Sequence, residues 1–390
     1  MIDYSSVLSD RVKEIKPSGI RKFFDIAAEM DDVISLSIGE PDFKTPYNIR
    51  EAGITALQKG HTFYTSNKGM QKFRDSICKY LKNRFNIEYS STEQCLVTVG
   101  GSEAIDLTIR ALLNEGDEVL IPTPCYVAYE PMVELAGGKS VIIPTKAENS
   151  FRLTGQEVKE RLTDKTKLLI LPFPNNPTGA VMRREHLEEI AEALKGTNVM
   201  ILSDEIYAEL TYGDKHVSCA EIDGLYERTV LVSGFSKAFA MTGWRLGYAC
   251  GPEPIISQIT KIHQYAIMCA PTISQYGAIE ALENSLESTE YMKEKYDMRR
   301  RFLIDALSEL GLTCFEPMGA FYIFPSIKNT GLSSEEFCQK LLKEEHVAVV
   351  PGTAFGESGE GFVRISYSYS LEHLKEAVKR IKRFLEKIRG

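Results

Sequence analysis

Hydrophobic runs alternate with helix-like segments along the middle of the chain. Between about residues 95 and 250, short apolar, β-branched runs are separated by segments with apolar positions at helical spacing. The expected strands are Cys95–Val99, Glu118–Ile121, Ser140–Ile143, Lys167–Leu171, Val199–Ser203, Thr229–Ser233 and Gly247–Cys250. The expected helices between them are Glu103–Leu113, Tyr129–Leu135, Gly155–Leu162 and Arg184–Leu194. This alternation predicts an α/β fold with a mostly parallel, seven-stranded sheet flanked by helices on both faces.

The pattern changes towards the end of the chain. Ile255–Leu286 is mainly helical in pattern, and a charged helix is expected over Tyr291–Leu310. The following apolar segments and helices are Gly319–Phe324, Ser334–Glu344, Val347–Val350, Phe362–Ser366 and Leu371–Ile388. We therefore expect a large domain over residues 48–289 and a smaller α+β domain built from residues 1–47 and 290–390.

Composition narrows the class of protein without identifying it. The 390 residues suffice for about two domains, and 43% hydrophobic with 26% charged residues is typical of a soluble globular protein. A net charge of −8 argues against general nucleic-acid binding, and no apolar run approaches the ~20 residues that span a bilayer. No secretory signal is visible at the start of the sequence, so we expect a cytoplasmic protein with no membrane partner.

The eight cysteines and six histidines do not suggest a metal site. The cysteines are scattered without a Cys-x-x-Cys pair, and no two histidines lie at ligand spacing. We therefore expect free thiols, as in a reducing cytoplasm, and no bound metal.

The most informative residue is a lysine that follows the expected strand Thr229–Ser233. Lys237 lies near the carboxyl end of this strand, where open α/β sheets bind their ligands. A partly desolvated amine there can lose its proton and attack a carbonyl to form a Schiff base. The alternative is an ordinary surface lysine, but three other strand ends carry complementary groups, which favours a ligand site.

Those strand ends carry polar groups of different kinds. The first expected strand leads into a glycine turn and a helix start, so Gly101 and Ser102 offer N–H groups to an anion, although such turns are also common architecture. Asn176, in a turn rich in proline and asparagine, offers an uncharged donor. Asp204 ends another strand, either as a cleft carboxylate or as a helix N-cap. Tyr207 would lie on the same helical face as Asp204.

Together these groups match the chemistry of one cofactor. They supply an amine for an aldehyde, a glycine turn for a phosphate, a carboxylate for a ring N–H, and hydroxyl and amide groups for a phenolic oxygen. That combination describes pyridoxal 5′-phosphate, which is held by a lysine Schiff base and an acidic partner of the ring nitrogen.

Five motifs, in order along the chain, carry a family resemblance. They are Ser37–Asp42, Asn176–Gly179, Ser203–Tyr207, Ser236–Lys237 with Gly243–Arg245, and Phe362–Ser366. With them the sequence resembles, over essentially its whole length, the class I/II aminotransferases of the aspartate-aminotransferase fold, fold type I of the enzymes that use pyridoxal phosphate. The resemblance implies a homodimer with shared active sites whose partners are small-molecule substrates, an amino acid and a 2-oxo acid.

The resemblance also implies roles for individual residues. The catalytic residues would be Lys237, Asp204 and Tyr207. The cofactor would contact Gly101, Ser102, Tyr126, Asn176, Asp204, Tyr207, Ser236, Lys237, Arg245 and, from a second subunit, Tyr64. The substrate α-carboxylate would bind Arg364, Asn176 and the backbone of Gly39. From the residues alone, the alternative for Arg364 is a solvated edge-strand arginine, and the favoured interpretations are a packed loop aromatic for Tyr126 and an exposed aromatic for Tyr64.

Two positions depart from the pattern of relatives. Many relatives carry a serine or threonine three residues before the lysine, where this sequence has Gly234, so the contact with the phosphate falls to Ser233 or Ser236. Some aspartate-directed relatives carry lysine at the position of Ser102, and its absence argues against a dedicated aspartate enzyme.

The predicted reaction is transfer of an amino group between an L-amino acid and a 2-oxo acid, with 2-oxoglutarate as the expected acceptor and ping-pong kinetics. Ser18–Phe23, Met241–Arg245 and Gly319–Phe324 are equally similar to aromatic amino acid aminotransferases and to N-acetyl-L,L-diaminopimelate aminotransferases. Two alternatives remain: a carbon–sulfur β-lyase on the same fold, and a cofactor-binding regulator. The regulator would need an appended basic domain, for which Met1–Tyr47 is too short.

Overall fold

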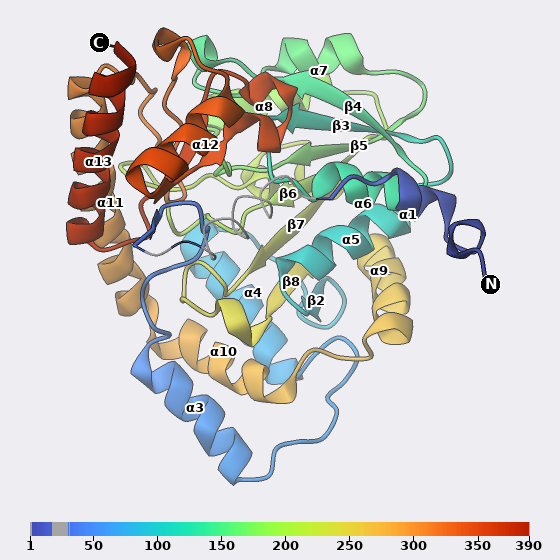
Figure 1. The fold of residues 1–390 in the computed structure, drawn as a ribbon. Helices are drawn as coiled ribbons and strands as arrows, with labels where there is room; N and C mark the ends of the chain where they lie inside the picture. Colours follow the sequence, from blue (N-terminus) through green and yellow to red (C-terminus); the bar gives the residue numbers. More distant parts are fainter. Residues whose placement is uncertain (1, 18–29, 31, 390) are drawn as a thin grey trace.

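A single seven-stranded sheet forms the centre of the molecule. The computed structural model describes residues 2–17, 30 and 32–389 (Figure 1). The sheet has the order β2-β8-β7-β6-β5-β3-β4. Its strands are β2 (Cys95–Thr98), β3 (Glu118–Thr123), β4 (Lys139–Pro144), β5 (Thr166–Leu171), β6 (Met200–Asp204), β7 (Thr229–Gly234) and β8 (Gly247–Cys250). Every pairing is parallel except those of β8, which runs antiparallel to β2 and β7. The predicted mostly parallel, seven-stranded sheet is confirmed.

Helices cover both faces of this sheet, because its central strands are apolar on both sides. Leu168 and Ile170 of β5 pack with one set of helices, whereas Leu169 and Leu171, on the opposite face, pack with another. The first set is α5 (Gly101–Leu112), α6 (Tyr129–Leu135) and α9 (Glu253–Ala266). The opposite face is covered by α4 (Gln71–Phe85), α7 (Gly155–Arg161), α8 (Arg184–Ala193) and α10 (Thr272–Asn284).

A second hydrophobic cluster gathers the last part of the chain. Its helices are α11 (Leu286–Glu309), α12 (Ser334–Glu345) and α13 (Leu371–Arg389), with α11 and α13 side by side (Figure 1). Its antiparallel strands are β9 (Tyr322–Ile323), β11 (Val350–Pro351) and β12 (Val363–Ser366). The early strand β1 (Ile34–Ser35) pairs in parallel with β10 (Val347–Ala348), which joins the N-terminal segment to this region. The division into domains at residues 47 and 289 stays a prediction.

The helices were predicted less accurately from the sequence than the strands of the large sheet. The stretch predicted as mainly helical over Ile255–Leu286 forms two helices, because the chain breaks after Ala266 and α10 begins directly behind Pro271, which has no N–H to continue a helix. The next helix, α11, begins at Leu286 rather than Tyr291. The pattern also left α3 (Tyr47–Gln58) and α4 unassigned.

The fold brings several chain segments to one edge of the sheet. β5, β6 and β7 are parallel neighbours, so Asn176, Asp204 and Lys237 follow strand ends on the same edge. The first residue of α5, Gly101, lies at this edge as well. Within the described residues, no helix has the length and apolar character needed to span a membrane.

Candidate active site

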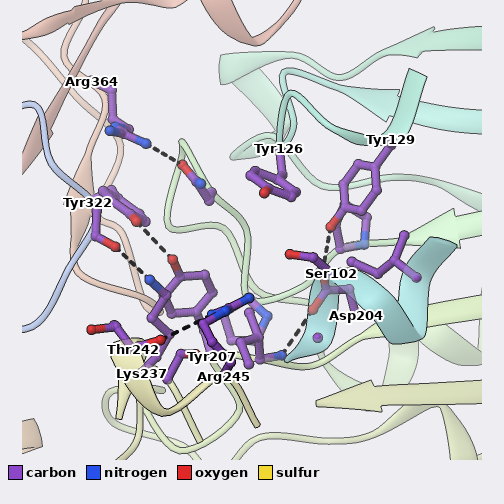
Figure 2. Close-up of a pocket in the computed structure, with 18 residues that line it drawn as sticks. Ser102, Tyr126, Tyr129, Asp204, Tyr207, Lys237, Thr242, Arg245, Tyr322 and Arg364 are labelled. Carbon is purple, nitrogen blue, oxygen red and sulfur yellow. Dashed lines mark hydrogen bonds between the residues drawn. The ribbon is translucent and has the colours of Figure 1, made fainter. Parts of the chain in front are cut away.

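A cavity of about 390 Å³ lies at this edge of the sheet, between it and the C-terminal region. It is lined by Gly39, Gly101, Ser102, Ile105, Tyr126, Tyr129, Pro172, Pro174, Asn176, Asp204, Ile206, Tyr207, Ser236, Lys237, Thr242, Arg245, Tyr322 and Arg364. Every residue that the sequence assigned to the site is among them except Tyr64 (Figure 2). The structure therefore gathers residues from five separate motifs in one pocket.

Lys237 enters the cavity from the loop after β7. Its Nζ donates a hydrogen bond of 2.6 Å to the backbone carbonyl of Gly39. Burial, aided by the positive charges of Arg364 and Arg245, lowers the pKa of Lys237 to about 8, although the charge of Glu40 opposes the shift. With this pKa roughly a tenth of the amine is unprotonated at pH 7 and about half at pH 8, and this fraction can act as a nucleophile or general base.

Asp204, the last residue of β6, is buried at the opposite side of the cavity. Its Oδ2 accepts a hydrogen bond of 2.7 Å from the hydroxyl of Tyr129, and its Oδ1 accepts one of 3.2 Å from the N–H of Ile206. Burial raises the pKa of Asp204, whereas the two hydrogen bonds act in the opposite direction. Two hydrogen-bond donors thus hold the carboxyl group at the wall of the cavity, where it can pair with a cationic N–H group of a ligand.

The residues after Asp204 form a turn instead of a helix, which corrects two expectations. Asp204 is not a helix N-cap, and Tyr207 does not reach the site by lying on a shared helical face. The turn nevertheless brings Tyr207 into the cavity, where its hydroxyl lies 2.8 Å from that of Tyr322. Burial raises the pKa of both phenols, so both stay protonated and available as hydrogen-bond donors.

Arg364 lies across the cavity from Asp204 and is only 3% exposed (Figure 2). Its guanidinium donates 2.9 Å to Oδ1 of Asn176 and also bonds the carbonyl of Ser37, between the rings of Tyr322 and Phe355. Among the described residues no carboxylate lies within ion-pair distance, and its Nε has no hydrogen-bond partner. The interpretation as a solvated edge arginine is wrong: Arg364 is a buried cation without a carboxylate partner among the described residues.

The glycine turn before α5 and the side chain of Arg245 form a positively charged part of the cavity wall, which we call the cationic corner. Gly100, with φ of +78°, precedes α5, and a Cβ there would lie 2.6 Å from the Arg245 guanidinium. A Cβ on Gly247 would lie 2.6 Å from the backbone of Gly100 and Gly101. The guanidinium and the N-terminus of α5 are therefore close together at the cavity wall, and both attract an anion such as a phosphate.

The hydroxyls of Ser233 and Ser236 point to different places. Ser233 Oγ donates 3.2 Å to the carbonyl of Glu205, away from the cavity, whereas Ser236 lines it. A side chain at Gly234 would meet the backbone of Leu246 and Gly247 at 3.0–3.1 Å. Close packing against β8 therefore accounts for glycine at this position, and of the two serines Ser236 is the one that lines the cavity.

Seven residues of the cavity were not predicted as site residues, and three of these carry a hydroxyl group: Tyr129, Tyr322 and Thr242. Tyr322 lies in a segment noted only for its resemblance to relatives, and Tyr129 was noted only as the start of a helix. The signal that was present is the spacing of Tyr129 three residues after Tyr126. Tyr64 is 80% exposed and does not line the cavity. The segment Ser18–Phe23 lies outside the described residues.

The fold and this site define an aminotransferase. The family described as "Aminotransferase class I and II" matches residues 31–381, and the chain belongs to it. The protein is an enzyme, and it has the aspartate-aminotransferase fold that the sequence predicted.

Individual relatives match over nearly their whole length. The Bacillus subtilis protein YugH, provisionally named an aminotransferase, is 53% identical over 383 residues, which are 98% of this chain and 99% of its own. An aspartate aminotransferase of Pyrococcus abyssi is 49% identical, with 97% and 98% of the two chains covered. The solved aromatic aminotransferase of Pyrococcus horikoshii is 46% identical, with a TM-score of 0.89 over 94% of this chain and 99% of that one. Relatives with different substrate names are thus about equally similar.

Proposed function

We propose that the protein is a pyridoxal-phosphate-dependent transaminase with its active site in the cavity described above. The observation that carries this proposal is the opposition of a desolvated lysine amine, Lys237, and a buried carboxylate, Asp204, across one cavity that has a cationic corner. An amine, a carboxylate and an anion-binding corner around one cavity are the groups that pyridoxal phosphate requires.

The residues present fit this cofactor. Lys237 would hold it covalently and Asp204 would pair with its ring nitrogen, while Tyr126 would stack on its ring. Its phenolic oxygen would bind Asn176 and Tyr207. Its phosphate would bind Gly101, Ser102, Ser236 and Arg245.

Different residues of the cavity would transfer the proton and bind the substrate. When bound, pyridoxal phosphate supplies an electron sink that stabilises the charge left when a Cα proton departs. Lys237, with its lowered pKa, would take this proton and return it. Arg364 would bind the α-carboxylate through two parallel hydrogen bonds, with Asn176 and the backbone of Gly39 beside it, which fixes the direction of the Cα–H bond. The first product leaves before the second substrate binds, so the kinetics are ping-pong.

The described lining of the cavity does not decide the amino donor by charge alone. Its cations are Lys237, Arg245 and Arg364, and each already has a role, whereas aspartate, N-acetyl-L,L-diaminopimelate and 2-oxoglutarate all carry a second carboxylate that needs a further donor. Some aspartate-directed relatives have a lysine for this purpose at the position of Ser102. Aromatic amino acids and N-acetyl-L,L-diaminopimelate remain the two proposed donors, with 2-oxoglutarate as acceptor, whereas one close relative is named for aspartate.

We also propose a cytoplasmic homodimer in which Tyr64 reaches the site of the second subunit. Tyr64 and its neighbour Phe63 are each about four-fifths exposed, at 80% and 81%, as is Tyr265 at 88%. Aromatic side chains this exposed are typical of surfaces that a partner covers. The eight cysteines are free thiols, which is consistent with a reducing compartment.

Borohydride reduction of the loaded protein, followed by peptide mapping, tests the proposal. The cofactor should be found fixed on Lys237, and a donor screen with 2-oxoglutarate should show amino transfer from aromatic amino acids or N-acetyl-L,L-diaminopimelate. Cofactor on another lysine, or none bound, would contradict the proposed site. Pyruvate and ammonia released from cystathionine without amino transfer would show a β-lyase instead.

A further inference from the structure

Tyr129 makes two contacts that link separate parts of the cavity. It begins α6 and is only 1% exposed. Its hydroxyl donates 2.7 Å to Oδ2 of Asp204 (Figure 2). Its ring meets the ring of Tyr126 edge to face, with centroids 5.6 Å apart and planes at 85°. One side chain thus contacts both the carboxylate proposed for the ring nitrogen and the aromatic ring proposed to stack on the cofactor.

The two oxygens of Asp204 have one donor each. The hydroxyl of Tyr129 donates a hydrogen bond to Oδ2, and the N–H of Ile206 donates one to Oδ1. A carboxylate removed from water needs such donors to stay ionised, because burial favours its neutral form. Glu205, the next residue, adds a negative charge that also raises the pKa of Asp204. Of the two donors, the backbone N–H comes with the turn itself, whereas the hydroxyl depends on a side chain that a single substitution removes.

Tyr129 can act only as the donor in this contact. Burial and the charge of Asp204 raise the pKa of Tyr129 well above that of a free phenol, so its proton stays in place at physiological pH. The other titratable side chains that line the cavity make no hydrogen bond to Asp204 in the described structure; they are Tyr126, Tyr207, Lys237, Arg245, Tyr322 and Arg364.

We propose that Tyr129 is a positioning residue that keeps Asp204 ionised and aimed at the cavity, and so fixes how strongly the site holds a protonated ring nitrogen. This rests on the proposed function, because it is the bound cofactor that supplies the ring nitrogen. Tyr129 itself acts through Asp204 and Tyr126 and touches no reacting atom.

Tyr129→Phe tests the proposal, because phenylalanine keeps the ring contact with Tyr126 and removes only the hydroxyl. The matched control is Tyr80→Phe: Tyr80 is also buried and also donates its hydroxyl to a carboxylate, Glu209, but lies outside the cavity. Two measurements apply to each variant: titration of the Asp204 carboxyl by ¹³C NMR in the cofactor-free protein, and the dissociation constant for pyridoxal phosphate.

In Tyr129→Phe the pKa of Asp204 should rise by about one to two units, the change expected when a donor to a buried charged acceptor is lost. The dissociation constant for pyridoxal phosphate should increase roughly 10- to 100-fold. Tyr80→Phe should leave both quantities at their wild-type values. An unchanged pKa of Asp204 in Tyr129→Phe, or an equal loss of affinity in Tyr80→Phe, overturns the proposal.

Failure of this inference and failure of the proposed function give different results. Wild-type protein that takes up no pyridoxal phosphate would contradict the proposed function. The titration of Asp204 needs no cofactor, so it still decides whether Tyr129 keeps the carboxylate ionised.

Discussion

At the scale of single residues, burial determines what the ionisable groups of the cavity can do. It lowers the pKa of Lys237 to about 8 and raises that of Asp204. It also lowers the pKa of Arg364, which nevertheless remains a cation because the ordinary value lies far above neutrality. Arg364 is therefore a charge held away from water among neutral acceptors, and a bound carboxylate would relieve that situation.

Arg364→Lys should reduce turnover of every amino donor while the cofactor stays bound. Lysine keeps the charge but lacks the planar pair of donors, so orientation suffers more than attraction. We expect a loss of about 2–4 kcal/mol in transition-state binding, or roughly 30- to 1,000-fold in kcat/KM. Steady-state kinetics with donors of different side chains, together with the absorbance of bound cofactor, measure this. Loss of cofactor, or a sharp difference between aromatic and acidic donors, would assign Arg364 to another part of the site.

At the scale of elements, the cationic corner depends on how closely β8 approaches the turn before α5. The two backbones meet at Gly247, where a Cβ would lie 2.6 Å from the backbone of Gly100 and Gly101 and 2.9 Å from the carbonyl of Ser233. Because all three neighbours are backbone atoms, none can move aside as a flexible side chain does. The antiparallel strand β8 thus positions the N-terminus of α5.

Gly247→Ala should displace this turn. We expect the free energy of unfolding to fall by about 1–3 kcal/mol, as for other overpacked sites, and the affinity for pyridoxal phosphate to fall with it. Calorimetry of the cofactor-free protein and a binding titration measure the two effects. Gly243→Ala is the control, since a Cβ there meets nothing within 4 Å. If Gly247→Ala matched this control in both measurements, the turn would not depend on close packing.

The sequence predicted the elements better than their contacts. Strand positions agree with the structure within one or two residues, because apolar β-branched runs bounded by glycine and proline are local signals. The direction of β8 was not predicted, because an apolar run marks a buried strand without showing which way it runs against its neighbours. Tyr129 and Tyr322 were missed because they act through partners 75 and 115 residues away.

At the scale of the whole molecule, Tyr64 is the predicted site residue that does not line the cavity. Tyr64 lies on the surface with Phe63, whereas the other predicted residues line the cavity. The loop that carries it is tied to its own subunit through Thr272, whose hydroxyl bonds the carbonyl of Phe63. A contribution of Tyr64 to catalysis therefore requires a second copy of the chain, which the proposed dimer provides.

Mixing two defective variants tests this arrangement. Lys237→Ala should be inactive, and Tyr64→Ala should bind the cofactor roughly 10-fold more weakly, as expected for loss of a hydrogen bond to a charged group. After dissociation and reassociation of an equal mixture, hybrid dimers would carry one site with both residues intact. About one quarter of all sites would then be restored if subunits reassort at random. Light scattering should show a dimer throughout; a fully active monomer, or no recovery in the mixture, would refute shared sites.

The residues that form the cavity are synthesised at different times, because they lie far apart along the chain. Ser37 and Gly39 emerge from the ribosome early, but the groups that bond their carbonyls, Lys237 and Arg364, are made much later. Among the strands that the structure describes, the outer strand β2 is the first of the large sheet to be made, and it pairs only with β8, which is the last. A growing chain can thus complete the sheet and the cationic corner while it still lacks the arginine proposed to bind substrate. A chain that stopped before β12 would keep a place for the phosphate but would lack the arginine proposed to hold the carboxylate of an amino acid.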